Sequence, residues 1–372
     1  MIYDVIIIGG GLSGLALSIS LGKKGYQVAV IEKGEYPRHK VCGEYISKES
    51  YRYLQEICPT LEKMSLPNID TFRLTAGKKA VLEMSLTLGG FGISRFILEN
   101  EMMQEATTLG VIFYLKNKAS EVSFQAETDT YFVKTHTETL AGKIVCGAFG
   151  RKSNMDYLYP KKYTIPTNYI GVKYHIQTQH PDNLIAIHSF EGGYCGISNI
   201  ENGKSCLCYL VNSEKLKACN NDIKEMERRF LYENTALKNV FENSTFLFLQ
   251  PLTISNVHFE IKEAIHQGVF CVGDAAGCIA PITGNGMSMA LRSACYLADL
   301  LDDFFRQKID RKGLEIAYTT VWKEHFSLRI RLSRFFQKMS ESPFLTKMMM
   351  VFLYFFPALK GRLIKMTHGL PF

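Results

Sequence analysis

The N-terminal strand–turn–helix pattern constrains the fold more than any other feature of the chain. An apolar run at 3–8, rich in isoleucine, is typical of a strand buried on both faces of a parallel sheet. Gly9, Gly11 and Gly14 follow with the spacing G-x-G-x-x-G, and an apolar stretch to about Lys24 then predicts a helix. Such glycines allow a tight turn, close approach of a phosphate group and close helix–strand packing. The chain is therefore expected to begin with a βαβ unit that binds a dinucleotide at the helix N-terminus.

An acidic residue follows at the end of the second expected strand, residues 27–31. The Glu32 carboxylate, eighteen residues after the last glycine of the fingerprint, would accept hydrogen bonds from the adenosine ribose. Its negative charge disfavours a ribose 2′-phosphate, which excludes NADP from this crevice and leaves FAD and NAD. Leu12, Ser13 and Lys33 flank these positions and are further candidates for cofactor contact. The alternative is a glycine-rich turn in an unrelated α/β protein.

A second motif decides between the two cofactors. Gly-Asp-Ala-Ala-Gly at 273–277 follows an apolar run at 269–272, and Pro-Ile-Thr-Gly-Asn-Gly-Met stands at 281–287. With both motifs, the chain resembles a superfamily of FAD-dependent oxidoreductases that includes p-hydroxybenzoate hydroxylase-type enzymes, geranylgeranyl reductases and flavin halogenases. The resemblance implies that Asp274 binds the ribityl chain of FAD and that 281–287 lies against the isoalloxazine, with a helix N-terminus aimed at its N1/C2 carbonyl. The candidate contacts are Gly273, Asp274, Pro281, Gly284, Gly286 and Met287.

Two segments between these motifs extend the resemblance, which spans residues 1 to about 310. Arg95, in Gly-Ile-Ser-Arg, resembles the family arginine that contacts FAD near its pyrophosphate, and Ala119 falls where the family's backbone contacts adenine. Residues 147–153 resemble the family sequence Gly-Ala-Asp-Gly-x-x-Ser, but Phe149 replaces the Asp. Because that Asp-Gly pair supports contacts with a pyridine nucleotide in the hydroxylases, the replacement argues against direct reduction by NAD(P)H.

Residues 33–50, after the second expected strand, are expected to form a polar, irregular loop, and this loop indicates one branch of the superfamily. Pro-Arg-x-Lys-x-Cys-Gly-Glu at 37–44 resembles the loop of geranylgeranyl reductases, where a Cys-Gly pair lies close to the flavin and the cysteine acts in reduction. Reduction of an isolated C=C bond needs a hydride on one carbon and a proton on the other. The Cys42 thiol, beside Arg38 and Lys40, could supply that proton. Arg38, Cys42 and Gly43 are candidate cofactor contacts. The alternative is that Cys42 is a small packed residue.

The expected substrate segment matches this branch only in part. The reductases carry Tyr-x-Trp-x-Phe-Pro, and the comparable stretch at 192–198 keeps Tyr194 but lacks the Trp and the Phe-Pro. Tyr194 is therefore a candidate substrate contact, and packing in a sheet core is the alternative, which we favour. Flavin halogenases carry Trp-x-Trp-x-Ile-Pro, whereas Trp322 is the only tryptophan here, which excludes a halogenase of that kind.

The expected fold class is α/β: a Rossmann-like FAD-binding domain of the glutathione reductase type, a second β-sheet substrate domain and a helical C-terminus. The FAD-binding domain is discontinuous because its motifs lie at both ends of the chain. The expected segments are 1–60, 92–160 and 262–310 for the FAD-binding domain, 61–91 and 161–261 for the substrate domain, and 311–372 for the basic helical region.

All excess positive charge lies near the C-terminus. The net charge is +7, and residues 321–372 hold nine basic and two acidic residues, so the rest of the chain is balanced. Apolar residues at helical spacing over 322–339 accompany a basic stripe within 331–338, and twelve apolar residues follow at 348–359. Because a bilayer span needs about 20 residues, this run is too short to cross one. The region is expected to lie in a membrane interface or, as we favour, to cover the substrate domain; without an aromatic–basic groove, nucleic acid is not an expected partner.

Cysteine and histidine usage indicates neither disulfides nor a metal. The ten cysteines include no C-x-x-C pair, and no secretory signal precedes the first strand, so reduced thiols in a cytoplasmic protein are expected. The nine histidines show no metal-ligand spacing, and no metal site is expected.

These observations predict an FAD-dependent enzyme that reduces C=C bonds of a lipophilic, isoprenoid- or polyketide-like substrate by hydride from flavin N5, with Cys42 as the acid. NAD(P)H, a reduced ferredoxin or a reduced flavin would be the external electron donor. The alternative is a monooxygenase that hydroxylates or epoxidises a lipophilic or aromatic substrate through a flavin C4a-hydroperoxide, which needs only a dry pocket. A non-catalytic flavin-binding or anchoring protein is disfavoured by the ring-side motifs. The expected location is the cytoplasm, and peripheral contact with the inner membrane surface through the C-terminal region stays open.

Overall fold

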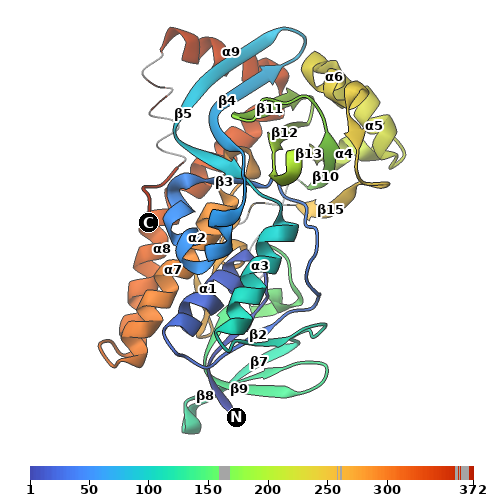
Figure 1. The fold of residues 1–372 in the computed structure, drawn as a ribbon. Coiled ribbons are helices and arrows are strands. Elements are labelled where there is room, and N and C mark those ends of the chain that lie inside the picture. Colours follow the sequence, from blue (N-terminus) through green and yellow to red (C-terminus); the bar gives the residue numbers. More distant parts are fainter. Residues whose placement is uncertain (159–167, 258, 260–261, 357–358, 360, 362–367) are drawn as a thin grey trace.

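Two β-sheets lie at opposite ends of the molecule, and the long helices α7 (Gly286–Phe305) and α8 (Arg311–Ser340) run along one side (Figure 1). This architecture confirms the expected α/β class with two sheets and a helical C-terminus. Three basic residues of the C-terminal region, Lys360, Arg362 and Lys365, and the expected domain boundary at 160/161 lie outside the described residues. The computed structural model describes residues 1–158, 168–257, 259, 262–356, 359, 361 and 368–372.

The first sheet is built around the parallel pairing that the N-terminal pattern predicts. β1 (Ile2–Ile8) lies between β2 (Val28–Ile31) and β9 (Thr139–Gly147), parallel to both, so its residues 5–8 are buried. The strand order is β16 (Ile265–His266), β17 (Val269–Cys271), β9, β1, β2 and β6 (Ile112–Tyr114), with β8 (Thr130–Lys134) on β9 and β7 (Glu121–Gln125) on β8.

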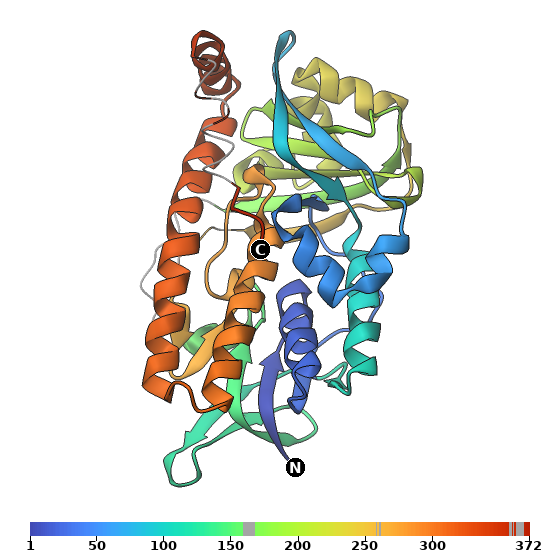
Figure 2. The same cartoon turned by 60° about the vertical axis from the view of Figure 1, so that its left-hand side comes forward.

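Helices cover this sheet and complete its core. α1 (Leu12–Lys23) packs against α7 and against α3 (Arg95–Thr108). α3 begins after Ser94, whose Oγ accepts a hydrogen bond from the N–H of Ile97 at 3.3 Å, the geometry of an N-cap. α2 (Tyr51–Ile57) adds a short helix beside α1, and Figure 2 shows α7 and α8 lying side by side.

The second sheet is antiparallel apart from one parallel pair, β4 (Asn68–Ala76) with β11 (Leu184–Phe190). Three helices lie on one side of it: α4 (Ser213–Lys217), α5 (Ile223–Phe230) and α6 (Thr235–Asn243). α9 (Pro343–Phe355) packs on β4, β11 and β5 (Ala80–Gly92). The order is β14 (Thr245–Phe246), β10 (Tyr169–Gln177), β13 (Ser205–Asn212), β12 (Gly193–Asn199), β11 (Leu184–Phe190), β4 (Asn68–Ala76), β5 (Ala80–Gly92) and β3 (Tyr45–Ser47), with β15 (Leu252–Val257) on β10.

The segment 33–50, expected to be an irregular loop, contains a strand. β3 pairs with the end of β5 in the second sheet, although it lies within the first segment expected for the FAD-binding domain. Gly90 makes the pairing possible, because a Cβ there would lie 2.4 Å from the ring of Tyr45. The division of the chain into domains stays a prediction.

Candidate cofactor and active site

The turn between β1 and α1 brings backbone segments into contacts that only glycine allows. Gly9 has a φ of +111°, and a Cβ there would lie 2.4 Å from the carbonyl oxygen of Ala148. A Cβ on Gly14 would lie 2.0 Å from the carbonyl oxygen of Gly9, so α1 can approach the strand only at a glycine. Gly11 differs, because the nearest atom to its Cβ position is the ammonium Nζ of Lys40, at 3.3 Å. The turn is thus closed by backbone at Gly9 and Gly14 and faces a cation at Gly11, which suits a phosphate group.

Glu32 lies at the expected ribose end of this turn. Its Oε2 accepts a hydrogen bond from the N–H of Gly10 at 2.8 Å, and its Oε1 accepts one from the N–H of Gly34 at 2.9 Å. The guanidinium of Arg38 lies 2.7 Å from Oε1. Burial raises the pKa of Glu32, but Arg38 and the hydrogen bonds outweigh burial and leave that pKa below its ordinary value. The carboxylate is therefore ionised and fixed, while Lys33 beside it is exposed.

Three cations converge on one buried carboxylate next to Gly11. Glu99, on α3, contacts Arg95 and lies 3.5 Å from the Nε of Arg38 and 3.5 Å from the Nζ of Lys40. Burial raises the pKa of Glu99, but Arg95, Lys40 and Arg38 outweigh burial and lower it. The Nε of Arg95 is buried with no hydrogen-bond partner among the described residues. Excess positive charge with a spare buried donor fits the pyrophosphate of FAD.

The second motif meets the first at the start of α1. Gly273 has a φ of +60°, and its Cβ position is 2.8 Å from the Oγ of Ser13. The N–H of Gly273 donates a hydrogen bond to the Oγ of Ser293, on α7, at 2.9 Å. Burial raises the pKa of Asp274, although Arg151 opposes the shift. The ribityl contact that the resemblance implies for Asp274 stays a prediction, and the structure brings that residue to the end of the glycine turn.

Residues 281–287 pass beside Tyr45 of β3 and continue into the first turn of α7. A short turn at Pro281–Thr283 is followed by Gly284, whose φ of +68° places it in the left-handed region. The ring of Tyr45 lies 3.1 Å from the Cβ position of Gly284. α7 begins at Gly286, and Met287 is buried in its first turn. The N-terminus of α7 therefore lies beside β3, the strand that follows the loop carrying Cys42.

That loop, residues 37–44, is held by the second sheet. The Nζ of Lys173, on β10, donates a hydrogen bond to the carbonyl oxygen of Lys40 at 3.1 Å. The Sγ of Cys206, on β13, donates one to the carbonyl oxygen of Cys42 at 3.2 Å. Cys42 itself is half-buried and interacts with Arg95. Arg38, Lys40 and Arg95 form what we call the cradle. The candidate thiol thus lies between the cradle and the second sheet.

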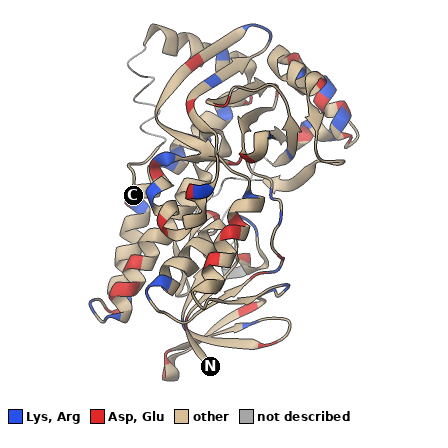
Figure 3. Ribbon diagram, in the orientation of Figure 1, with Lys and Arg blue, Asp and Glu red and all other residues tan. Residues whose placement is uncertain are grey.

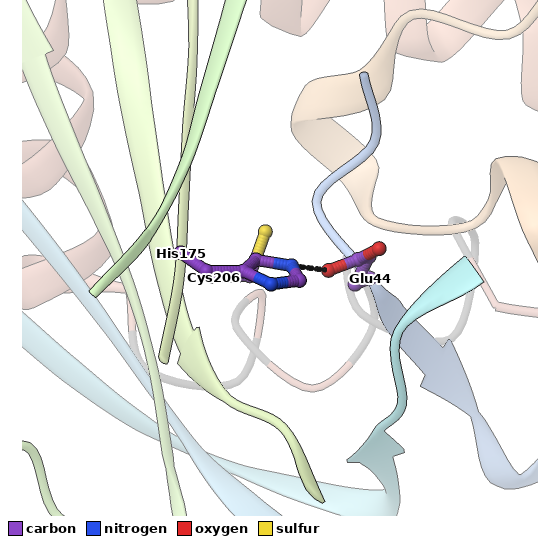
Figure 4. A group of neighbouring side chains, drawn as sticks. All are labelled: Glu44, His175 and Cys206. Carbon is purple, nitrogen blue, oxygen red and sulfur yellow. Dashed lines mark hydrogen bonds and ion pairs between the residues drawn. The ribbon is translucent and has the colours of Figure 1, made fainter. Parts of the chain in front are cut away.

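Glu44, Lys173 and His175 form what we call the buried clamp. The Oε1 of Glu44 accepts hydrogen bonds from the Nζ of Lys173 at 2.5 Å and from the N–H of Arg95 at 2.8 Å. Its Oε2 lies 2.7 Å from the Nε2 of His175 (Figure 4). Burial raises the pKa of Glu44, but His175 and Lys173 outweigh burial and lower it. The buried clamp ties the Cys42 loop to β10 and to the start of α3.

The same region contains three potential metal ligands. Ligand atoms of Glu44, His175 and Cys206 lie within 4.8 Å of one another (Figure 4). However, the Glu44 carboxylate is already paired with the Lys173 ammonium. Burial also raises the pKa of the Cys206 thiol, so the thiolate that a metal requires is disfavoured. These donors fit a hydrogen-bonded ion pair better than a metal, and we propose no metal here.

The remaining predicted site residues lie in three different surroundings. The carbonyl oxygen of Ala119 accepts a hydrogen bond from the Nδ2 of Asn154 at 2.7 Å, which fixes the backbone at the expected adenine end. Gly43 is exposed. Tyr194 is buried on β12 in an apolar cluster that also contains Met350 of α9, which is the core position that we favoured.

Sequence reasoning missed Glu99 and the buried clamp. A glutamate within the charged helix 95–108 carries no local signal of burial. Lys173 did carry one, because it stands in a mostly apolar stretch, 169–176, whose residues are mostly buried. Glu44 was part of the loop motif without an assigned role, and its partners come from a strand that is distant in sequence.

Comparisons with known proteins agree with this geometry. Residues 2–320 match the family described as FAD binding domain. Conditioned medium factor receptor 1 of Dictyostelium discoideum is 22% identical over 89% of this chain and 69% of its own length. Digeranylgeranylglycerophospholipid reductase 3 of Methanosphaera stadtmanae is 25% identical over 78% of this chain and 75% of its own. Ubiquinone hydroxylase UbiL of Rhodospirillum rubrum is 24% identical over 88% and 78% of the two chains.

Solved structures agree on the fold. The flavin-dependent brominase Bmp2 superposes with a TM-score of 0.80 at 19% identity, covering 99% of this chain and 93% of that one. At this identity the likeness shows the fold alone. The family match covers most of the chain, and its relatives include both reductases and hydroxylases, as the resemblance implied. The chain therefore belongs to the FAD-binding domain family and is an FAD-dependent oxidoreductase.

Proposed function

We propose that this enzyme reduces C=C bonds of a lipophilic, isoprenoid- or polyketide-like substrate. The observation that carries the proposal is the position of the Cys42 thiol, which is half-buried beside Arg95 where the cofactor cradle meets the second sheet. The similarity to a protein named digeranylgeranylglycerophospholipid reductase supports the class of substrate.

The protein's own residues would handle the proton. When bound and reduced by the external electron donor, FAD would supply the hydride to one carbon of the double bond. Cys42 gives its proton to the other carbon, the positive charge of Arg95 stabilises the thiolate that remains, and solvent then returns the proton. Arg38, Lys40 and Arg95 bind the pyrophosphate, and the buried clamp holds the loop that carries the thiol in place.

An apolar cluster supports a lipophilic substrate. Ile282, in the segment expected beside the isoalloxazine, packs against a cluster formed by the second sheet and α9. The cluster includes Tyr194, Leu210 and Leu353. A hydrocarbon chain that reaches Ile282 would therefore meet apolar side chains beside the expected isoalloxazine.

Replacement of Cys42 tests the assignment. In Cys42→Ala we expect turnover to fall by about a hundredfold or more while FAD content is unchanged, because the acid is lost and the cradle is intact. Cys295 is also half-buried but lies on α7, away from the Cys42 loop, so Cys295→Ala is the matched control and should keep full activity. Wild-type turnover in Cys42→Ala would remove the proposed acid.

A monooxygenase acting on a similar substrate is the second candidate. It is favoured by the similarity to ubiquinone hydroxylase UbiL over 88% of this chain. Rapid mixing of the chemically reduced holoenzyme with oxygen separates the two. A distinct absorbing species before oxidised flavin returns would support the monooxygenase, whereas direct and slow oxidation supports the reductase.

We further propose a cytoplasmic enzyme with an external electron donor. All ten cysteines are free thiols, which fits a reducing compartment. The donor would be NAD(P)H, a reduced ferredoxin or a reduced flavin, and Phe149 in place of the family's Asp argues against the first. Anaerobic titration with NADPH and NADH, followed by flavin absorbance, tests that choice.

A further inference from the structure

The outer face of α9 is apolar, although it is exposed. Met350 and Leu353 face inward and are buried in the cluster between α9 and the second sheet. Lys347 is the only charged residue in the helix. Among the outward side chains, the exposed fractions are Phe344 68%, Met348 55%, Val351 56%, Phe352 51% and Phe355 70%.

The second sheet carries a very different helix on its other side. The exposed positions of α5 are charged, with Lys224, Glu225, Arg228 and Arg229 facing solvent. Figure 3 shows this contrast between the alternating charges of α5 and the largely uncharged ribbon of α9 at the end of the molecule. Both helices bury apolar residues against the sheet, so packing on the sheet does not explain why the outer face of α9 is also apolar.

The exposed side chains of α9 also line a groove. Phe344, Val351 and Phe355 contribute to it together with Lys347, and its volume is about 780 Å³. Clustered exposed apolar side chains of this kind mark an interaction surface on a globular protein.

The charge around this face identifies its partner. The last turns of α8, which two residues separate from α9, expose Arg331, Arg334 and Lys338 together with Phe335. Glu341 in the connection is engaged by the hydroxyl of Tyr169. A basic surface next to exposed Phe and Met side chains complements an anionic lipid surface.

We propose that the outer face of α9 docks on an anionic lipid bilayer and lies in its interface. The helix has 13 residues, about 20 Å at 1.5 Å per residue, which is too short to span the hydrocarbon core. No helix among the described residues is long and apolar enough to cross a membrane. The inner face of α9 belongs to the cluster that reaches Ile282, so a docked α9 would separate the bilayer from the expected flavin side. The position of the flavin side rests on the proposed function, whereas the docking itself does not.

Vesicle binding tests the proposal without measuring turnover, so its failure is distinct from failure of the proposed reaction. The FAD-loaded full chain is sedimented with vesicles of phosphatidylcholine mixed with phosphatidylglycerol, and with vesicles of phosphatidylcholine alone. We expect binding to the mixed vesicles that weakens with salt. Phe352→Ser combined with Phe355→Ser should weaken it by about tenfold or more. Leu249→Ser, at a fully exposed leucine outside this face, is the matched control and should bind as the wild type does.

Three results would overturn the proposal. The wild type would fail to bind mixed vesicles, the double variant would bind as well as Leu249→Ser, or binding would be equal on both kinds of vesicle at all salt concentrations. Sedimentation velocity tests whether a second copy of this chain occupies the face instead of a bilayer. If the double variant converts a dimer to a monomer and neither protein binds vesicles, the face is occupied by a second copy of this chain.

Discussion

Among the three cations of the cradle, Lys40 has a lowered pKa, whereas the pKa values of Arg38 and Arg95 are raised. Burial lowers its pKa to about 8, and Arg95 and Arg38 add to that effect while Glu99 opposes it. Its Nζ lies 3.3 Å from the Cβ position of Gly11, where the fingerprint predicts the pyrophosphate. An anion there favours the charged ammonium, so FAD binding should take up a proton above pH 8.

We therefore expect FAD affinity to fall as the pH rises through about 8, by at most about tenfold per pH unit. Lys40→Arg should flatten the dependence, because a guanidinium stays charged throughout this range. Titration of the FAD-free protein with FAD, followed by flavin fluorescence at each pH, measures both proteins. Identical pH profiles for the two would show that Lys40 does not respond to the ligand.

The buried clamp depends on keeping its charges paired. Lys173 and Glu44 have no exposed side-chain surface, and their atoms lie 2.5 Å apart. Removing one partner of such a pair leaves an uncompensated buried charge, whereas removing both does not.

Lys173→Met should therefore lower the free energy of unfolding by about 3–5 kcal/mol. The double variant Lys173→Met with Glu44→Gln should recover part of this loss, because the unpaired carboxylate is gone. Urea denaturation of the FAD-loaded proteins at neutral pH gives both values. Equal losses in the single and double variants would mean that the charge of Glu44 is compensated in another way.

Within the β1–α1 turn, Gly14 is required for packing and Gly11 for the approach of a phosphate group. A Cβ on Gly14 would overlap the backbone oxygen of Gly9 at 2.0 Å, whereas a Cβ on Gly11 would meet only the ends of the flexible side chains Lys40 and Arg95. We expect Gly14→Ala to lower stability by about 1–3 kcal/mol. Gly11→Ala should change stability by only about 0.5 kcal/mol or less but weaken FAD binding by about tenfold or more, because its Cβ blocks the phosphate.

Thermal denaturation of the FAD-free proteins and FAD titration separate these two effects. If Gly11→Ala is as unstable as Gly14→Ala, Gly11 is a packing glycine. If it binds FAD as tightly as the wild type, the phosphate lies elsewhere.

Elements with a strong local pattern could be predicted from sequence. The strand before Gly9 and the helix after it have apolar periodicity and a fixed glycine spacing, and α3 has an N-cap at Ser94. β3 could not be predicted in this way, because three residues show no period and its pairing depends on the space that Gly90 leaves for Tyr45.

At the scale of the whole molecule, the site is assembled from both sheets. The resemblance to a known superfamily predicts that the two cofactor motifs belong to one FAD-binding domain. In the structure, Gly273 of the second motif lies against Ser13 of the first. The sequence could not show that Lys173 holds the Cys42 loop, because that contact joins residues far apart in the chain. It also left open two roles for the apolar stretch at the C-terminus, and in the structure α9 covers the second sheet with one face and exposes the other.

The most direct test of the proposed reaction is carried out without oxygen. The holoenzyme is reduced chemically under argon and mixed with a polyunsaturated isoprenoid lipid, while flavin absorbance and product mass are followed. We expect oxidised flavin to return under argon, with a product that has gained two hydrogen atoms, and we expect Cys42→Ala to slow this step. Flavin that stays reduced until oxygen is admitted, with a product that has gained an oxygen atom, would contradict the proposed reaction.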